Sequence, residues 1–200
     1  MDNDSLKKAV LENVRQRRST RSYLQQAVPA DVLEEVVEAG RYAPSANNLQ
    51  LTGFYVISNA EKLAELKTVV TGVLANMPER EGMPPVFINL INRAKEGLVD
   101  VTYGAPVLIV TTNKKGSPNA IADCSCALQN MMLAATANGL GNCWINQFFM
   151  LRDAPPIQEF FAGIGVSGDE EICGSLALGY AENLETAPLP RTGCQVTYVK

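Results

Sequence analysis

A short basic segment, Arg17-Arg18-Ser19-Thr20-Arg21, carries side chains suited to a phosphorylated ligand. If the segment is extended, Arg17, Ser19 and Arg21 share one face, and the two arginines are about 13 Å apart at roughly 3.3 Å per residue. Guanidinium makes bidentate contacts with phosphate. One arginine would then suit a phosphate, and the other a second acceptor at the far end of an elongated ligand. The alternative is a solvated, basic helix C-terminus that complements the helix dipole.

A second polar segment, residues 41–50, begins where a predicted helix must end, because Pro44 cannot continue it. Ser45, Asn48 and Gln50 supply hydrogen-bond donors and acceptors with little bulk. Such residues allow a flat ring to approach the backbone. An ordinary polar loop between a helix and a strand is the alternative interpretation.

Two further segments contain candidate ligand-binding residues. Residues 139–147 read Gly-Leu-Gly-Asn-Cys-Trp-Ile-Asn-Gln. They follow a predicted helix and lack a third glycine, so they do not match the dinucleotide-binding fingerprint. Their glycines are more typical of a turn out of a helix, and Trp144, the only tryptophan, is a candidate for the core. Arg191 stands in Leu189-Pro190-Arg191 and, taken alone, is a surface arginine.

The composition restricts the chemistry that these segments can perform. Histidine is absent, which excludes His-based triads, His-ligated zinc or haem, and imidazole as an acid or base. We therefore expect a bound cofactor to supply the chemistry. The net charge of −4 argues against nucleic acid as the main partner. Only 19% of the residues are charged, against roughly 25% in an average soluble protein, which suggests that a second copy covers part of the surface.

The N-terminus and the cysteines favour a cytoplasmic protein without a membrane partner. Residues 1–5 are polar and acidic, unlike a secretory signal. No apolar run approaches the roughly 18 residues of a membrane span. The five cysteines are odd in number and irregularly spaced. We therefore expect reduced thiols that pack as small apolar residues.

Hydrophobic periodicity predicts the elements that must position these residues. Helices are predicted at residues 6–16, 31–42, 61–74, 123–137 and 155–161. Strands are predicted at 53–58, 107–111, 172–180 and, as a final edge strand, 195–199, with 143–149 as a strand or extended segment. Residues 77–85 are a predicted loop. Because helices and strands mix without strict alternation, we predict a single α+β domain over residues 1–200.

Taken in order, these segments resemble the nitroreductase family of flavin mononucleotide (FMN) oxidoreductases. The family has Arg-Arg-Ser-x-Arg after a short first helix, here residues 17–21. It has Ala-Pro-Ser-Ala with Asn and Gln close behind, here 43–50, and Gly-Leu-Gly…Cys-Trp-Ile after the central helix, here 139–145. Leu-Gly-Tyr and Leu-Pro-Arg follow, here 178–180 and 189–191. The resemblance implies a three-layer α/β/α fold with a mostly antiparallel central sheet, in an intertwined homodimer.

Two features depart from the family pattern. The aromatic Pro-Trp pair that is common after the Gln is Leu51-Thr52 here. Residues 77–103 match no family segment, although this region shapes substrate entry in the family. The identity of the electron acceptor therefore stays open.

The resemblance also implies roles for individual residues. Arg21 would lie near N1 and O2 of the flavin ring. The residues implied to hold the FMN phosphate are Arg17, Arg18, Ser19 and Arg191. The residues implied to reach the flavin from the other subunit are Pro44, Ser45, Ala46 and Asn48. The residues implied to lie with their backbone against the ring, with an N–H near N5, are Trp144, Ile145 and Asn146.

The function implied is ping-pong transfer of electrons from NAD(P)H through FMN to a nitroaromatic, quinone or similar small-molecule acceptor. Reduced FMN carries negative charge at N1–C2=O, so a cation at Arg21 would stabilise it. This scheme requires no histidine. Two alternatives stay open: a family enzyme with other reductive chemistry (dehalogenation, enoate reduction or flavin cannibalism), and a non-catalytic FMN carrier or redox sensor.

Overall fold

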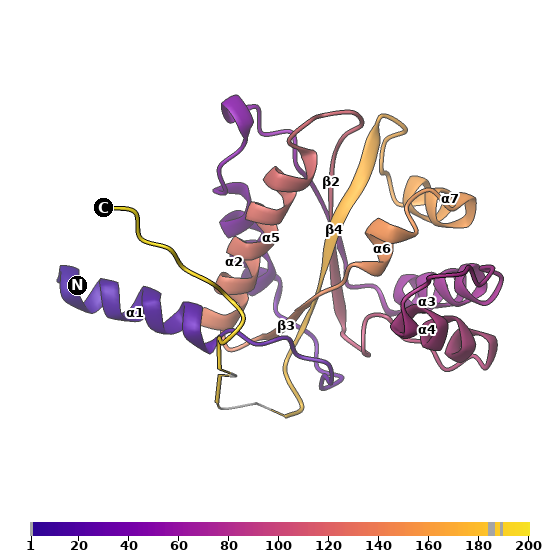
Figure 1. Ribbon diagram of the computed structural model, residues 1–200, viewed down its shortest axis with the longest axis horizontal. Coiled ribbons are helices and arrows are strands. Elements are labelled where there is room, and N and C mark those ends of the chain that lie inside the picture. The colour runs from indigo at the N-terminus through magenta and orange to yellow at the C-terminus, as the bar shows by residue number, and fades with distance from the viewer. Residues whose placement is uncertain (1, 184–186, 189) are drawn as a thin grey trace.

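The computed structural model describes residues 2–183, 187–188 and 190–200. Within this part of the chain, one antiparallel sheet of four strands forms the middle layer, in the order β1-β2-β4-β3. The strands are β1 (Gly53–Ile57), β2 (Val107–Lys114), β3 (Gly141–Trp144) and β4 (Glu170–Gly179). Helices cover both faces of the sheet (Figure 1). The α+β class and the three-layer arrangement are therefore confirmed.

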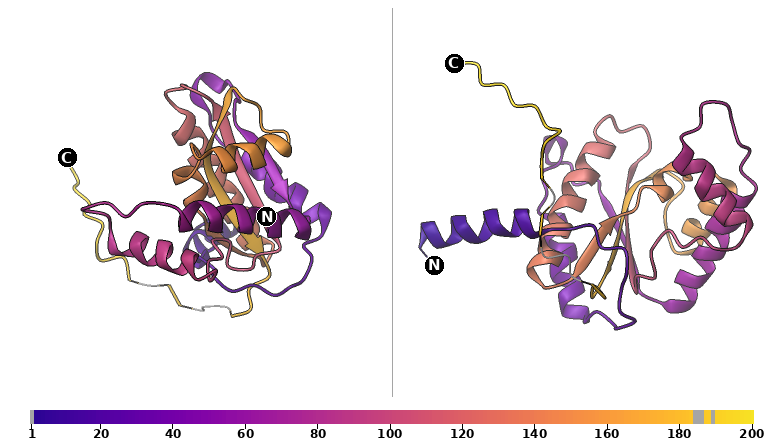
Figure 2. Two further views of the ribbon diagram at one scale, coloured as in Figure 1. Left: turned by 90° about the vertical axis from the view of Figure 1, so that its right-hand side faces the viewer. Right: turned by 60° about the horizontal axis from the view of Figure 1, so that its bottom comes forward.

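Each face of the sheet has its own set of helices and its own apolar core (Figure 1, Figure 2). One set is α2 (Ala30–Arg41) and α5 (Ala120–Ala137), and the other is α3 (Ala60–Ala75), α4 (Pro85–Lys95), α6 (Gln147–Met150) and α7 (Pro155–Gly163). Strand β2 contributes side chains to both cores. Leu108 and Val110 belong to the core beneath α3 and α7, whereas Val107 and Ile109 belong to the core beneath α2 and α5. An apolar run of this kind is typical of a strand buried on both faces.

Helix α1 (Asn3–Gln16) projects from this layered body (Figure 2). It begins with Asp2, whose carboxylate accepts a hydrogen bond from the Ser5 backbone N–H at 2.8 Å. The helix has no buried residue. Its apolar side chains are each about half exposed, and they are Leu6, Val10, Leu11 and Val14.

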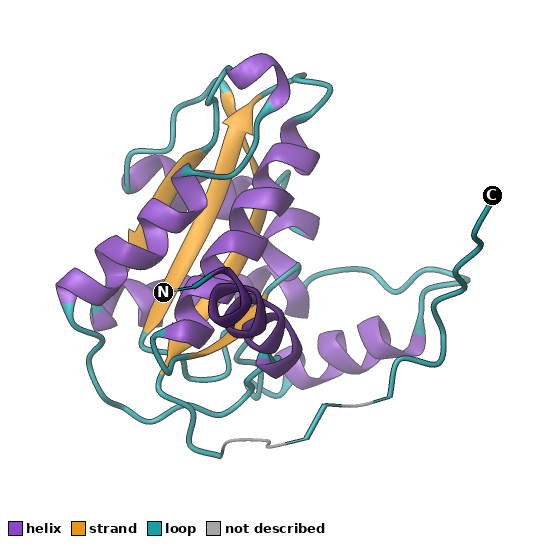
Figure 3. Ribbon diagram, turned by 90° about the vertical axis from the view of Figure 1, so that its left-hand side faces the viewer, coloured by secondary structure: helices purple, strands orange, loops and turns teal. Residues whose placement is uncertain are grey.

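Three segments differ from the sequence-based expectation. Pro85–Lys95 forms α4, within the stretch that the sequence left unassigned, because a proline is compatible with the first turn of a helix. The expected extended segment at 143–149 is divided, since β3 ends at Trp144 and α6 begins at Gln147. The expected edge strand at 195–199 is wrong. These residues are exposed and lead away from the sheet (Figure 3), so no neighbouring strand of this chain pairs with them.

The five cysteines are free, as expected, although only Cys124, Cys143 and Cys173 are buried and Cys126 and Cys194 are exposed. Across the described ranges, no helix has both the length and the apolar character to cross a membrane. The same residues include no group of three or more His, Cys, Asp or Glu side chains placed to hold a metal ion.

Candidate functional site

The basic segment that follows α1 is extended and runs beside β3. Ser19 forms a parallel bridge with Asn142, and the Thr20 N–H donates to the Asn142 carbonyl at 2.8 Å. The close approach depends on Gly141, since a Cβ there would lie 2.7 Å from Thr20 Oγ1. Gly139 has φ +71 and makes the turn out of α5. The glycine stretch therefore positions β3 against the basic segment.

Arg17, Ser19 and Arg21 all act on one buried thiol, that of Cys143 on β3. Burial raises the pKa of this thiol, whereas the Arg21 charge, a hydrogen bond with Ser19 and the Arg17 charge lower it. The three alternating residues of the basic segment therefore all lie within interaction range of Cys143. The Arg21 guanidinium also lies 5.9 Å from the centre of the Tyr103 ring, within the range of a cation–π contact.

Arginines that are remote in sequence converge beside this segment. Burial lowers the pKa of Arg17, and the charges of Arg191 and Arg18 lower it further. The ion pairs of the described residues, at distances up to 4.0 Å, include none of these three arginines and not Arg21. The charges of Arg18 and Arg191 near Arg17, with no carboxylate paired to them among the described residues, form an environment that favours an anion.

The Arg18 side chain folds back on the end of α1. Its Nη1 donates to the carbonyls of Arg15 at 2.5 Å and Arg17 at 2.7 Å. Its Nε is buried and has no hydrogen-bond partner among the described residues. A buried donor without an acceptor is costly, so this nitrogen fits a bound anion. Arg18, Ser19 and Arg21 line a cavity of about 610 Å³.

At the end of β3, residues 144–146 differ in whether their backbone groups are free to bind a ligand. Ile145 is buried, its N–H donates to the Ser175 carbonyl at 2.8 Å, and its carbonyl accepts from Ser175 Oγ at 2.7 Å. Trp144 is partly buried against the core beneath α2 and α5. Asn146 is exposed, and its N–H donates to no acceptor within the described residues. The N–H of Asn146 is thus available to a ligand, whereas that of Ile145 is not.

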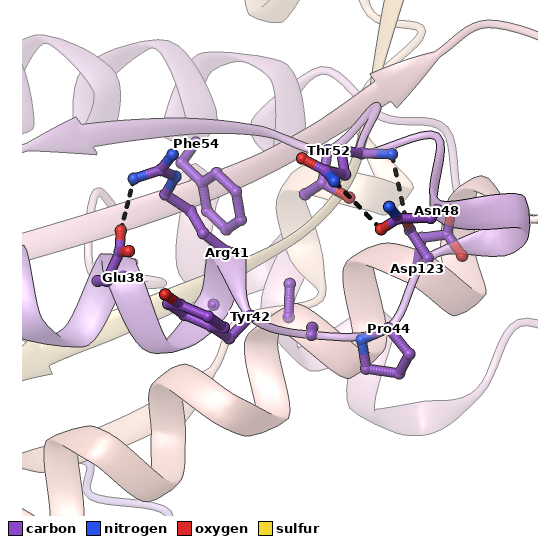
Figure 4. Close-up of a pocket in the computed structure, with 13 residues that line it drawn as sticks. Glu38, Arg41, Tyr42, Pro44, Asn48, Thr52, Phe54 and Asp123 are labelled. Atoms are coloured by element: carbon purple, nitrogen blue, oxygen red, sulfur yellow. Dashed lines mark hydrogen bonds and ion pairs between the residues drawn. The ribbon is translucent and has the colours of Figure 1, made fainter.

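The loop that follows α2 has an unusual backbone. Asn47, Asn48 and Gln50 have φ values of 51, 54 and 54, in the left-handed region that disfavours residues other than glycine. Side chains hold this shape: Gln50 N–H donates to Ser45 Oγ, and Gln50 Nε2 to Asn48 Oδ1, both at 3.1 Å (Figure 4). Backbone strain of this kind concentrates at functional sites.

Asp123 of α5 anchors the same loop, and the sequence analysis missed it. Its carboxylate accepts a hydrogen bond from the Ala46 N–H at 3.1 Å, and only 8% of the residue is exposed. The available signal was that Asp123 is the only charged residue of α5. Asp123, Pro44, Ser45 and Asn48 line a cavity of about 520 Å³ (Figure 4).

The two groups of expected ligand-binding residues do not meet within one chain. The loop with Pro44, Ser45, Ala46 and Asn48 lies at the upper end of the sheet, and the basic segment lies at the lower end (Figure 1). No residue lines both cavities. Of the late Leu-Pro-Arg stretch, Arg191 is described and lies near Arg17, whereas Leu189 lies outside the described residues.

A third cavity, of about 400 Å³, adjoins the end of β3 on the other face of the sheet. Gln147, which follows Asn146, lines it together with residues of α3, α4 and their connecting loop. Its apolar lining includes Leu74, Met77, Met83, Phe87, Leu90 and Met150. Part of the segment that matched no family motif therefore forms an apolar cavity.

Comparisons with known proteins agree with this geometry. The sequence model of the nitroreductase family matches residues 14–180. A Bacteroides fragilis nitroreductase structure with bound FMN is similar, at 33% identity and a TM-score of 0.85 over 96% of this chain and 98% of that one. A Desulfitobacterium hafniense nitroreductase with bound FMN shares 25% identity, with a TM-score of 0.81 over the full length of both chains.

A curated relative gives the same result. Nitrobenzene nitroreductase of Ectopseudomonas oleovorans is 26% identical over 202 residues, which cover 85% of this chain and 86% of the relative. The family match spans most of the chain, from the end of α1 to the residue after β4. The chain therefore belongs to the nitroreductase family.

Proposed function

We propose that this protein is an FMN-dependent oxidoreductase that takes electrons from NAD(P)H and delivers them to a nitroaromatic, quinone or similar acceptor. The observation that carries the proposal is the convergence of Arg18 and Arg191 on Arg17. Within the part of the chain that the structure describes, these arginines pair with no carboxylate, and the buried Arg18 Nε has no acceptor. These residues fit a phosphate. The FMN-bound nitroreductases with the same fold support the identity of the ligand.

The residues of the basic segment divide into two groups along its length. Arg17, Arg18, Ser19 and Arg191 hold the phosphate. Arg21, four residues further along the extended segment and about 13 Å from Arg17 at roughly 3.3 Å per residue, lies at the polar edge of the ring. A cation there stabilises negative charge that develops at N1 and O2. The N–H of Asn146 would be free to donate to the ring, whereas Trp144 and Ile145 hold that end of β3 in place.

The site requires a second copy of the chain. The loop with Pro44, Ser45, Ala46 and Asn48 lies far along the sheet from the basic segment (Figure 1), so in our proposal a partner supplies it. Exposed apolar side chains on α1 and the C-terminal residues support a dimer: Val10 is 53% exposed, and Tyr198 is 83% exposed. Exposed apolar side chains gathered along one helix, as on α1, are typical of an interface.

When bound, FMN accepts a hydride from the nicotinamide and passes two electrons to the acceptor. The chain binds and orients these reactants. The apolar cavity beside Gln147 offers Phe87 and three methionines to a flat, apolar acceptor. The names of relatives suggest the donor and the acceptor: one is an FMN reductase (NADPH) of Bacillus subtilis, and another is the nitrobenzene nitroreductase.

The test begins with the visible spectrum of the purified protein, which should show a bound flavin. Steady-state oxidation of NADH and NADPH should then depend on nitrobenzene or a benzoquinone. A yellow protein without this activity would support the alternative of an FMN carrier or redox sensor. A colourless protein that binds no added FMN would contradict the proposal.

A further inference from the structure

The pairing of β2 with β4 contains an irregularity that re-aims one cysteine. Thr111 lies opposite Gly174, and Thr112 lies opposite Ile172, so Cys173 is the extra residue of a β-bulge. Ile172 packs in the core beneath α3 and α7. Cys173 instead packs with Ala120 and Cys124 of α5. The bulge therefore directs the Cys173 thiol toward the opposite face of the sheet, where α5 lies.

Gly174 gives independent evidence for this direction. A Cβ on Gly174 would lie 2.6 Å from the Leu128 Cδ1 atom of α5, so this residue also faces α5. In a regular strand, neighbouring residues face opposite sides. Cys173 and Gly174 face the same side, and the missing side chain of Gly174 lets α5 approach β4 closely. The buried Cys124 and Cys173 consequently pack together in one cluster with Ala120.

Polar groups surround the Cys124 thiol even though the residue is fully buried. Its Sγ donates to the Thr112 carbonyl at 3.3 Å and lies 3.9 Å from Thr52 Oγ1. The side chains of Thr111 and Asn113 also lie near it. Asn113 is itself completely buried, and its Nδ2 has no partner among the described residues. A buried donor without an acceptor fits a neighbouring sulfur that gains negative charge.

The surroundings of the two thiols change their pKa values in opposite directions. The hydrogen bond with Cys173, together with those from Thr52 and Thr111, lowers the pKa of Cys124 against the effect of burial. The same hydrogen bond and burial raise the pKa of Cys173. The thiolate is the reactive form of cysteine, so Cys124 is the better nucleophile of the pair.

The Cys124 thiol lies close to a cavity that a small oxidant can enter. Thr52, which contacts the Cys124 sulfur, also lines the cavity of about 520 Å³. Asp123, directly before Cys124 on α5, and Ala127, three positions after it, line the same cavity (Figure 4 labels Thr52 and Asp123). Thr52 therefore connects the Cys124 thiol to the wall of this cavity.

We propose that Cys124 and Cys173 form a redox-active dithiol that a hydroperoxide converts to a disulfide. The Cys124 sulfur attacks one peroxide oxygen, the O–O bond breaks, and the leaving hydroxide takes the Cys124 proton to form water. The Cys173 sulfur then attacks the sulfenic sulfur, the S–O bond breaks, and hydroxide leaves with the Cys173 proton as a second water. Two thiols give two electrons to one hydrogen peroxide. A dithiol reductant reverses the change by exchange.

The experiment treats the reduced full-length protein with hydrogen peroxide and then alkylates it with iodoacetamide under denaturing conditions. Digestion with trypsin and chymotrypsin without a reductant is followed by mass spectrometry. We expect a peptide pair joined through Cys124 and Cys173, and a count of free thiols that falls by two and recovers with dithiothreitol. The matched control is Cys126→Ser, an exposed neighbour two positions along α5, which should leave the linked pair unchanged.

Two single variants test the roles of the sulfurs, and circular dichroism checks that each is folded. In Cys173→Ser, peroxide should leave a sulfenic acid at Cys124 that reacts with dimedone. In Cys124→Ser, Cys173 should give no dimedone adduct. One result would overturn the proposal. Peroxide oxidises the exposed Cys126 of the parent protein, yet iodoacetamide still alkylates both Cys124 and Cys173. A disulfide to Cys126 or Cys194 would overturn it as well, and this mapping in the parent does not depend on whether the variants fold.

Discussion

The backbone N–H of Ala46 donates a hydrogen bond to the Asp123 carboxylate at 3.1 Å, joining the loop after α2 to the first turns of α5. The two residues are 77 positions apart in the sequence. The loop adopts left-handed conformations at Asn47, Asn48 and Gln50, which local interactions alone stabilise poorly. This buried contact therefore fixes the loop in the position from which, in our proposal, it reaches the flavin site of a partner.

Removing the carboxylate should loosen this loop. A hydrogen bond to a charged group contributes about 1.5–3 kcal/mol, so Asp123→Ala should lower the free energy of unfolding by about that amount. Asp123→Asn keeps an oxygen at the same position and should lose less. Urea denaturation of the three proteins measures the difference. Equal stability of Asp123→Ala and the parent would show that the contact does not hold the loop.

Removing one arginine of the phosphate group should weaken FMN binding. Loss of a charge-assisted hydrogen bond costs roughly 1.5–3 kcal/mol, which is about ten- to a hundred-fold in affinity. We expect losses of this size for Arg17→Ala and for Arg191→Ala in a fluorescence titration of the apoprotein with FMN. Lys62→Ala is the control, because it removes one charge from a surface pair on α3. Unchanged affinity in both arginine variants would exclude this phosphate assignment.

Sedimentation should show a dimer of twice 21.6 kDa for the FMN-bound protein. Val10→Asp places a charge on the apolar side of α1, where 53% of the Val10 surface is exposed. We expect this variant to lose the dimer and bound FMN together, since each site requires both chains. Leu98→Asp is the control, because Leu98 is also exposed but lies after α4. A stable monomer of the parent that retains FMN would refute the shared site.

The protein should lose stability at alkaline pH partly through Tyr55. Burial and the hydrogen bond to Glu170, with Oη–Oε2 at 2.7 Å, raise its pKa from 10.0 to about 12. The folded state thus holds this proton more tightly than the unfolded chain does. The resulting stability is complete below pH 10 and is lost as the pH rises toward 12.

Tyr55→Phe should remove this component of the pH dependence. The measurement is the free energy of unfolding of the variant and the parent at pH 8 and pH 11. The difference between them should shrink at the higher pH. Tyr198→Phe serves as the control, because Tyr198 is 83% exposed and should lose stability in parallel with the parent. A constant difference between Tyr55→Phe and the parent would rule out this role.

The sequence predicted those parts of the fold that local patterns determine. Apolar periodicity located α2, α3, α5 and the strands β1, β2 and β4, because each buries a face or both faces in the core. The apolar pattern gave a wrong prediction at residues 195–199. Alternating apolar and polar residues form a strand only where another strand pairs with them. The apolar pattern also missed α4, because Pro84 and Pro85 resemble a loop although Pro85 starts a helix.

The candidate site was predictable only in part, for a different reason. The basic segment and the late Arg191 follow from residue types that suit a phosphate, but their proximity depends on the path of the whole chain. The role of Asp123 depends on a tertiary contact with Ala46. The Asn146 N–H is free because the pairing of β3 with β4 gives the Ser175 carbonyl to the Ile145 N–H and leaves no carbonyl of the described residues for Asn146. No local sequence pattern encodes these relationships.

A substitution at Arg21 should separate an effect on the reduction potential of FMN from an effect on FMN binding. Its guanidinium packs over Tyr103, with 5.9 Å between the Arg21 Cζ atom and the ring centre, and its charge reaches Cys143 on β3. If the same charge faces N1 and O2 of the flavin, it favours the anionic reduced ring over the neutral oxidised ring. Arg21→Gln keeps a hydrogen-bond donor and removes the charge, so oxidised FMN should still bind.

The two-electron midpoint potential of Arg21→Gln should therefore fall. A differential loss of about 1.4 kcal/mol corresponds to roughly 30 mV for a two-electron couple. Reduction by NAD(P)H in a stopped-flow half-reaction should slow in the same variant, because developing negative charge loses its stabiliser. Potentiometric titration of the parent, Arg21→Gln and the charge-conserving Arg21→Lys makes the comparison, and Arg21→Lys should retain most of the parent potential. An unchanged potential together with weakened FMN binding would place Arg21 in the phosphate group and reverse the orientation of the ligand along the basic segment.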